Sequence, residues 1–133
     1  MNPIVLIVDD EKPTRDGLRA ALDEKFDVYV AADAKEARQV LNSEPVDVLL
    51  TDLRLGANSG MDLLDEALTL SKPPVSIMMT AYGSVDTAVE AMRRGAWHFV
   101  TKPLNLEEVE LLLTRAARGR NIESENRRLS SEN

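Results

Sequence analysis

Five short apolar runs alternate along the chain with stretches in which apolar residues recur every three or four positions. The runs are nearly continuous and rich in β-branched residues, which is typical of strands covered on both faces. They extend over Ile4 to Val8, Val28 to Ala31, Val46 to Leu50, Val75 to Met79 and Trp97 to Val100. Because crossovers between parallel strands are right-handed, the pattern predicts an α/β fold with a doubly wound, five-stranded parallel sheet.

The intervening stretches have the ends expected of helices. Asp33 can cap the helix that follows it, and Pro13 can occupy a first helical turn. Gly60 and Ser84 stand where two further helices would begin, and Gly95 follows a last turn. The apolar residues at helical spacing are Leu18, Ala21, Leu22, Ala34, Ala37, Val40, Leu41, Leu63, Leu64, Ala67, Val85, Ala88, Val89 and Met92.

The C-terminal stretch predicts one extended helix that begins at Leu106. It contains no proline and changes from apolar to strongly charged, with a break in its apolar period near Gly119. Two roles for its last part stay open. It is either a solvated tail or a coiled coil that joins two copies, for which Ile122 and Leu129 are seven residues apart.

Composition limits the classes of function. With 133 residues and 44% hydrophobic content, the chain fits one globular domain. It has no Cys and one His, which excludes disulfides, thiolate metal sites and multi-histidine zinc sites. The net charge of -7 argues against direct nucleic-acid contact by this segment. Neither a signal peptide nor an apolar span of roughly 18 residues is present, so we expect a cytoplasmic protein without membrane contact.

Five polar residues stand where predicted strands end. Asp9 and Asp10 follow the first run, Asp52 the third, Thr80 the fourth and Lys102 the fifth. Because the carboxyl ends of parallel strands share one edge of a sheet, these residues should gather at a single site. Three acids would repel each other there unless a divalent cation neutralised them, and oxygen ligands select a hard ion such as Mg²⁺. The cluster therefore suggests metal-assisted phosphoryl chemistry.

Several of these residues also have a simpler explanation. A single Asp at a strand end is usually a turn or cap residue, Lys102 could be a surface lysine, and Thr80 could be a β-branched strand residue. The convergence of three acids at one edge argues against that reading. We expect Trp97 to pack in the core or against a face, and His98 to be a solvent-facing strand residue rather than a ligand.

Separated motifs resemble the receiver domain of two-component response regulators. They are VDDE after the first strand, TDLRLGANSGMDLL around Asp52, and TAYGSVDTAVEAMRRGAWHFVTKPL. The resemblance covers Ile4 to Ala117 and implies a flavodoxin-like (βα)5 fold. The stretch from Thr80 to Leu104 is most similar to receivers of the nitrogen-regulation type. In that subfamily, a sensor histidine kinase phosphorylates the receiver. Full-length members carry an AAA+ ATPase and a DNA-binding domain, and they activate transcription through an alternative sigma factor.

The resemblance also implies residue roles. Asp52 would be the phosphoacceptor, and Asp10, Asp52 and the main-chain carbonyl of Arg54 would bind Mg²⁺, with Asp9 acting through water. Lys102 and Thr80 would neutralise the phosphoryl group, and the bond between Lys102 and Pro103 would be cis. Thr80 and Phe99 would act as switch residues. The site residues that the resemblance implies are thus Asp9, Asp10, Asp52, Arg54, Thr80, Phe99, Lys102 and Pro103.

The implied protein is a signalling domain rather than an enzyme. Residues 1–117 would form the receiver, and residues 118–133 a helical linker towards an output domain. A homodimer would form through the C-terminal helix or through an output face made of Ser84 to Arg94, the last strand and the helix from Leu106. The loop after Asp52 departs from the family pattern, because Gly56 replaces a common proline. We expect Gly56→Pro to alter dephosphorylation more than metal affinity.

Three other classes remain to be weighed. A hydrolase of the haloacid dehalogenase type also uses an Asp nucleophile, but in a DxD arrangement after the first strand, which VDDE lacks. A flavodoxin-like binding module would need a phosphate-binding loop there, where Asp9, Asp10 and Glu11 would repel phosphate. A degenerate receiver would act by protein contacts alone, without phosphorylation.

Overall fold

The computed structural model describes residues 2–55, 58–81 and 85–132, and side chains within these ranges except at 58, 59, 85 and 120–132. Ser84 and Gly56, singled out as a cap and a loop departure, lie outside the described residues, as do the side chains of Ile122 and Leu129. Among the described helices, none is long and apolar enough to cross a membrane.

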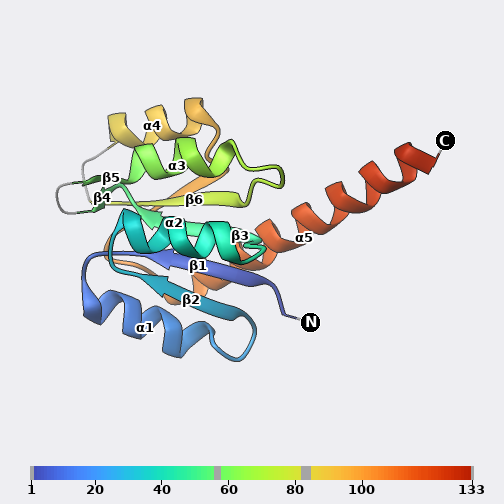
Figure 1. Cartoon of the computed structure of the whole chain (residues 1–133). Coiled ribbons are helices and arrows are strands. Elements are labelled where there is room, and N and C mark those ends of the chain that lie inside the picture. The colour runs from blue at the N-terminus through green and yellow to red at the C-terminus, as the bar shows by residue number, and fades with distance from the viewer. Residues whose placement is uncertain (1, 56–57, 82–84, 133) are drawn as a thin grey trace.

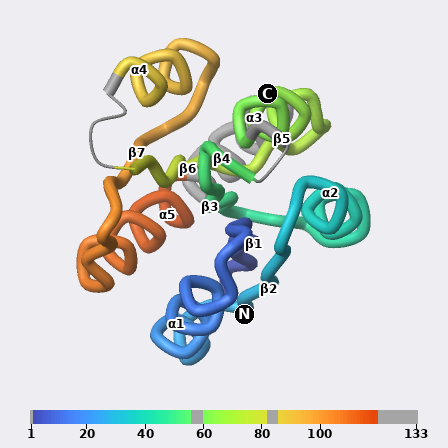
Figure 2. Tube along the Cα trace, turned by 90° about the vertical axis from the view of Figure 1, so that its left-hand side faces the viewer, coloured from blue at the N-terminus to red at the C-terminus, as the bar shows by residue number. Residues whose placement is uncertain are grey.

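The predicted fold is confirmed. Five parallel strands form one sheet in the order β2-β1-β3-β6-β7, with helices on both faces (Figures 1 and 2). The strands are β1 (Ile4–Val8), β2 (Asp27–Ala31), β3 (Val48–Asp52), β6 (Val75–Thr80) and β7 (His98–Thr101). The helices are α1 (Lys12–Leu22), α2 (Ala34–Ser43), α3 (Gly60–Leu68), α4 (Val85–Arg94) and α5 (Leu106–Glu132).

The core lies on both faces of the sheet. Helices α1 and α5 pack on one face against alternate strand residues such as Ile7, Leu50 and Ile77. The residues between them, such as Leu6 and Leu49, point to the face covered by α2 and α3 (Figure 2). Strands buried on both faces explain why the sequence runs are continuous rather than alternating.

The predicted helix ends agree with the structure where it describes them. The Asp33 carboxylate accepts a hydrogen bond from the Glu36 N–H at 2.8 Å, Pro13 lies in the first turn of α1, and Gly60 begins α3. Gly95 follows α4 with φ of 123°, a conformation that favours glycine. Helix α5 continues past Gly119 to Glu132, so the break in the apolar period does not end it (Figure 1).

Three features differ from expectation. Strand β3 begins at Val48, two residues after the start of the predicted run, because the Val46 N–H bonds the Glu44 carbonyl at 2.9 Å in the preceding loop. A short antiparallel hairpin, β4 (Arg54–Leu55) and β5 (Asn58–Ser59), follows β3 and was not expected. Strand β7 begins at His98 rather than at Trp97, which is 42% exposed and so fits packing against a face but not in the core, and His98 is exposed as predicted.

Candidate functional site

The carboxyl ends of β1, β3, β6 and β7 meet at one edge of the sheet and bring the five predicted residues together. A cavity of about 280 Å³ opens there, and Asp10, Asp52, Thr80 and Lys102 are among its lining residues. Asp9 lies beneath them, fully buried, and contacts Lys102. The parallel register pairs Thr80 with Thr101, and the Lys102 N–H donates to the Thr80 carbonyl at 2.8 Å, which fixes the two strand ends side by side.

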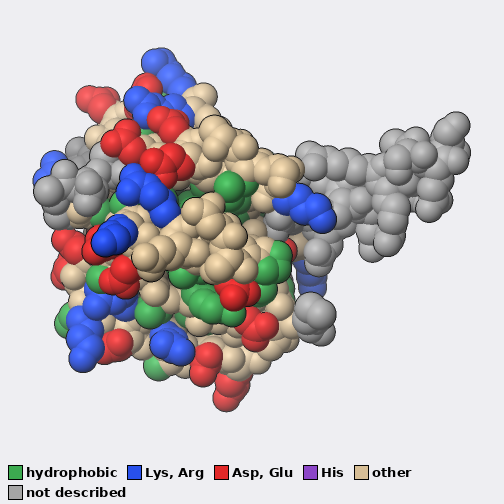
Figure 3. Space-filling view, in the orientation of Figure 1, with side chains coloured by type: hydrophobic (Ala, Val, Ile, Leu, Met, Phe, Trp, Pro, Cys, Tyr) green, Lys and Arg blue, Asp and Glu red, His purple; other side chains and the backbone are tan. Residues whose placement is uncertain are grey.

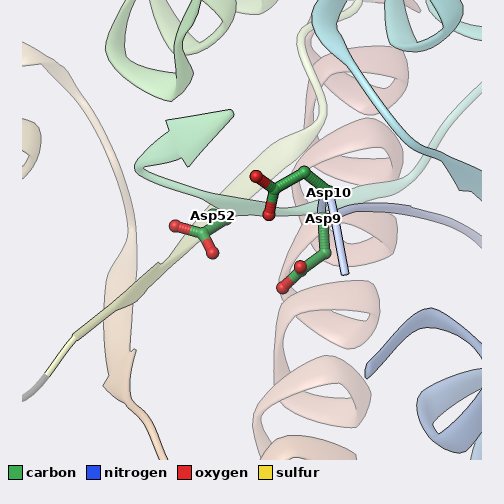
Figure 4. A group of neighbouring side chains, drawn as sticks. All are labelled: Asp9, Asp10 and Asp52. Carbon is green, nitrogen blue, oxygen red and sulfur yellow. The ribbon is translucent and has the colours of Figure 1, made fainter. Parts of the chain in front are cut away.

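Three carboxylates form the acidic part of the site. Each of Asp9, Asp10 and Asp52 offers an oxygen, and these oxygens lie within 4.8 Å of one another. Figure 4 shows Asp9 and Asp10 approaching from the end of β1 and Asp52 from the end of β3. Their burial differs, since Asp9 is buried, Asp52 is partly buried and Asp10 is exposed. Such close negative charges need neutralisation.

Lys102 supplies one positive charge to this cluster. Its Nζ donates to Asp52 Oδ2 at 2.7 Å and to Asp9 Oδ2 at 2.8 Å, and it lies 3.6 Å from Glu11 Oε1. Burial acts to lower the pKa of Lys102, but the hydrogen bonds and negative charges of Asp52 and Asp9 outweigh it and raise the pKa above its ordinary value. The ammonium therefore stays charged at neutral pH.

Backbone amides fix two of the three carboxylates. The Glu11 N–H donates to Asp9 Oδ1 and the Arg54 N–H to Asp52 Oδ1, each at 2.8 Å. Asp52 and Asp9 are thus each held between one amide and the shared lysine. This arrangement orients their oxygens before any ligand binds, which is a requirement for catalysis by positioning.

Gly60 supports the position of Asp52 from the start of α3. Its N–H donates to the Leu53 carbonyl at 2.9 Å, and a Cβ at this position would lie 2.0 Å from the Asp52 main-chain oxygen. Only glycine allows this approach of α3 to the end of β3. The sequence marked Gly60 as a helix start, and its contact with Asp52 becomes evident only in the fold.

The donor set fits a hard divalent cation. The cluster offers only oxygen ligands, of which Asp10 and Asp52 line the open cavity, and carries more negative charge than Lys102 neutralises. Mg²⁺ matches this chemistry. The Asp9 carboxylate is buried and already bonded to Lys102 and Glu11, so it suits an indirect role better than direct ligation.

Sequence reasoning missed four residues of the cavity wall, Glu11, Leu53, Ala81 and Thr87, of which Glu11 and Thr87 are polar. Glu11 directly follows the two acids, and this adjacency could have identified it. Thr87 comes from the first turn of α4, and only the packing of α4 beside β6 places it there. Phe99 does not line the cavity but is half-buried on β7, where it pairs with Met78 of β6 and packs against the core cluster to which Met78 belongs. The bond between Lys102 and Pro103 is cis.

Comparisons with known proteins agree on one family. The sequence model of the family described as the response regulator receiver domain matches residues 5–114 of this chain. The response regulator protein PilR of Pseudomonas aeruginosa is 44% identical over 121 residues, which are 90% of this chain and 27% of PilR. A solved structure of NtrX from Brucella abortus superposes with a TM-score of 0.90 at 31% identity, over 97% of this chain and 30% of NtrX.

A separate receiver structure is similar over its whole length. The signal receiver domain of a LuxO repressor protein from Vibrio parahaemolyticus has a TM-score of 0.86 and 28% identity, over 93% of this chain and 96% of that domain. The first curated relatives, in contrast, are much longer, and this chain spans 27% of their length.

Proposed function

This chain belongs to the response regulator receiver domain family, and we propose that Asp52 is the residue at which it accepts a phosphoryl group from a sensor histidine kinase. The observation that carries the proposal is the position of the Asp52 carboxylate. It lies at the wall of an open cavity, bonded to Lys102 and the Arg54 amide, with the Thr80 side chain on the same wall.

The reaction is an in-line displacement. An Asp52 carboxylate oxygen attacks the phosphorus, the bond to the phosphohistidine nitrogen breaks, and an acyl phosphate forms while the imidazole takes up a proton. The Lys102 ammonium neutralises charge on the transferred oxygens, and the Thr80 hydroxyl donates a hydrogen bond to them, each from its own strand end. Mg²⁺, held by Asp10, Asp52 and the Arg54 carbonyl with Asp9 acting through water, would neutralise further phosphoryl charge when bound.

Phosphorylation would then change the surface near α4. A phosphoryl group adds close to two negative charges beside Thr80. We infer that Thr80 follows the phosphoryl group and that Phe99 changes its packing in response. Phe99 lies on β7, one of the three elements of the face that α4, β7 and α5 form, and it packs against a core cluster that includes Ala91 of α4, so a change in its packing would reach that face.

The output face has the apolar surface that a partner would need. Val89 and Met92 on α4, Trp97 before β7, and Leu106 and Leu111 on α5 are all exposed. We propose that this face, or the helix beyond residue 117, forms a homodimer, and that the full-length protein carries AAA+ ATPase and DNA-binding domains. The receiver itself would contact neither nucleic acid nor membrane and would work in the cytoplasm as a signalling domain, not an enzyme.

Intact mass spectrometry after incubation with acetyl phosphate and Mg²⁺ tests the acceptor role. Wild type should gain one phosphoryl group in an adduct that is stable in acid and labile in base. Asp52→Asn should gain none, and chelation of Mg²⁺ should suppress the wild-type reaction. An adduct that persists in Asp52→Asn would refute the assignment. No adduct on wild type, with no binding of beryllofluoride, would instead favour a receiver that acts by protein contacts alone.

A further inference from the structure

Arg15 contacts the chain on both sides of Asp10. Its backbone N–H donates to the Glu11 carbonyl at 3.2 Å, as part of the first turn of α1. Its side chain turns back, and Nη1 donates to the Asp9 carbonyl at 2.7 Å. The two carbonyls that flank Asp10 are therefore both held by one half-buried residue.

Asp10 differs from the other two acids in how it is held. The carboxylates of Asp9 and Asp52 each accept hydrogen bonds from a backbone amide and from Lys102. Within the described part of the chain, no hydrogen bond to the Asp10 carboxylate is found, and this side chain is exposed. The direction of the Asp10 side chain therefore depends on the backbone that carries it. The carbonyl of the peptide unit between Asp9 and Asp10 accepts the hydrogen bond from the Arg15 side chain.

We propose that Arg15 is a positioning residue for Asp10, and that it sets the affinity of the acidic cluster for Mg²⁺ without touching the ion. This inference rests on the proposed metal-binding role of the cluster. Groups that orient metal ligands typically change metal affinity by about 10–100-fold when they are removed. Because Arg15 bonds a carbonyl rather than a carboxylate oxygen, we expect the lower end of that range.

The direction in which Mg²⁺ affinity changes when Arg15 is removed distinguishes a positioning role from a purely electrostatic one. Arg15 is a positive charge near a cation site, so its removal should strengthen Mg²⁺ binding if charge alone mattered. Loss of the 2.7 Å bond to the Asp9 carbonyl should instead loosen the turn at Asp10 and weaken binding. The two explanations therefore predict opposite changes in the Mg²⁺ dissociation constant.

Calorimetric titration with Mg²⁺ on Arg15→Met and Arg19→Met tests the proposal. Arg19 is the matched control, because it is an exposed arginine one turn further along α1, and in the described ranges its side chain makes no hydrogen bond to the acidic turn. Arg15→Met should bind Mg²⁺ about tenfold more weakly than wild type, and Arg19→Met should bind it equally well or slightly more tightly. Equal or tighter binding by Arg15→Met would overturn the proposal.

A second readout needs no metal. The Glu11 amide, which donates to Asp9 Oδ1, should exchange its hydrogen faster in metal-free Arg15→Met and at the wild-type rate in Arg19→Met. If wild type fails to bind Mg²⁺, the proposed metal role fails, yet unchanged Glu11 exchange would separately overturn the role of Arg15. Circular dichroism checks folding. If Arg15→Met is unfolded, Arg15→Gln replaces it, since that side chain is two atoms shorter and loses the same bond.

Discussion

Replacing Lys102 with Met removes the ammonium that joins Asp9 to Asp52 and keeps most of the apolar stem. The metal-free variant would retain three carboxylates whose oxygens lie within 4.8 Å of one another. Among the residues that the structure describes, the fully buried Asp9 carboxylate would keep the Glu11 amide as its one hydrogen-bond donor. We therefore expect Lys102→Met to be less stable than wild type in the absence of Mg²⁺.

The size of the stability loss depends on how far these ion pairs are exposed to water. Removal of one partner from a fully buried pair costs about 3–5 kcal/mol. The Lys102 side chain is 22% exposed and that of Asp52 is 13% exposed, so water screens part of the remaining charge. We expect the free energy of unfolding in chelator to fall by about 2–3 kcal/mol.

Mg²⁺ should reverse this loss. Lys102 and the ion compete for the same carboxylates, and a unit charge about 5 Å from a divalent ion at an effective dielectric constant of about 40 repels it by about 3 kcal/mol. Screening reduces this figure, and we expect Lys102→Met to bind Mg²⁺ about tenfold more tightly. At a concentration 100 times the dissociation constant, the ion stabilises the fold by about 2.7 kcal/mol.

Urea unfolding followed by circular dichroism, in chelator and in Mg²⁺, measures both effects. Lys25→Met is the control, because Lys25 forms an exposed ion pair with Glu110 far from the acidic cluster. It should change stability little and leave the response to Mg²⁺ as in wild type. A Lys102→Met variant as stable as wild type in chelator would refute the reasoning, and so would a smaller gain from Mg²⁺ than wild type shows.

Further substitutions test the supports of the site. Gly60→Ala should lower the free energy of unfolding by about 3 kcal/mol and slow phosphorylation of Asp52, since its Cβ would meet the Asp52 carbonyl. Gly17→Ala, with no atom within 4 Å of the new Cβ, should raise it by about 0.5–1 kcal/mol in the same urea assay. Gly95→Ala, at φ of 123°, should lower it by about 1–3 kcal/mol, measured by thermal unfolding. Because the folded state raises the pKa of Lys102 from its ordinary 10.5, the stability that Lys102 supplies should be constant from about pH 7 to 9 and should fall as pH rises above about 10.5. Urea unfolding of wild type and Lys102→Met from about pH 7 to above pH 10.5 measures this contribution as the difference between their free energies of unfolding. A difference that increased with pH would contradict the expected fall.

The positions of the site residues were predictable because they follow from topology. Once the strands are parallel, residues that end them share one edge, whatever their separation in sequence. Asp9, Asp52, Thr80 and Lys102 meet for this reason alone, and an error of two residues in the start of β3 did not move Asp52 from its edge.

The supports of the site were not predictable in the same way. The contact of Gly60 with the Asp52 carbonyl depends on how closely α3 approaches β3, and the bond from Arg15 to the Asp9 carbonyl depends on the angle at which α1 leaves the sheet. Both are distances between elements, and hydrophobic period determines the type of an element rather than its distance from a neighbour.

Helix α4 shows a further limit of periodicity. Val89 and Met92 recur at helical spacing, but they are 44% and 38% exposed, whereas Ala88 and Ala91 are fully buried. The small side chains lie against the molecule, and the large ones face solvent, which hydrophobicity alone does not predict.

The anchoring of α4 has an energetic consequence. Burial of an alanine methyl contributes only about 0.8 kcal/mol. The ion pairs of Arg94 with Asp65 on α3 and Glu90 on α4 are exposed and add little, on a surface where acidic and basic side chains are interspersed (Figure 3). Helix α4 is thus held weakly, although its Thr87 lines the wall of the acidic cavity. A phosphoryl group can shift an equilibrium only by the difference in its interactions with two states. Because α4 is weakly held at the edge of the site, a smaller difference in phosphoryl interaction energy between the two states is enough to move it. We therefore expect α4 to be the first helix to move.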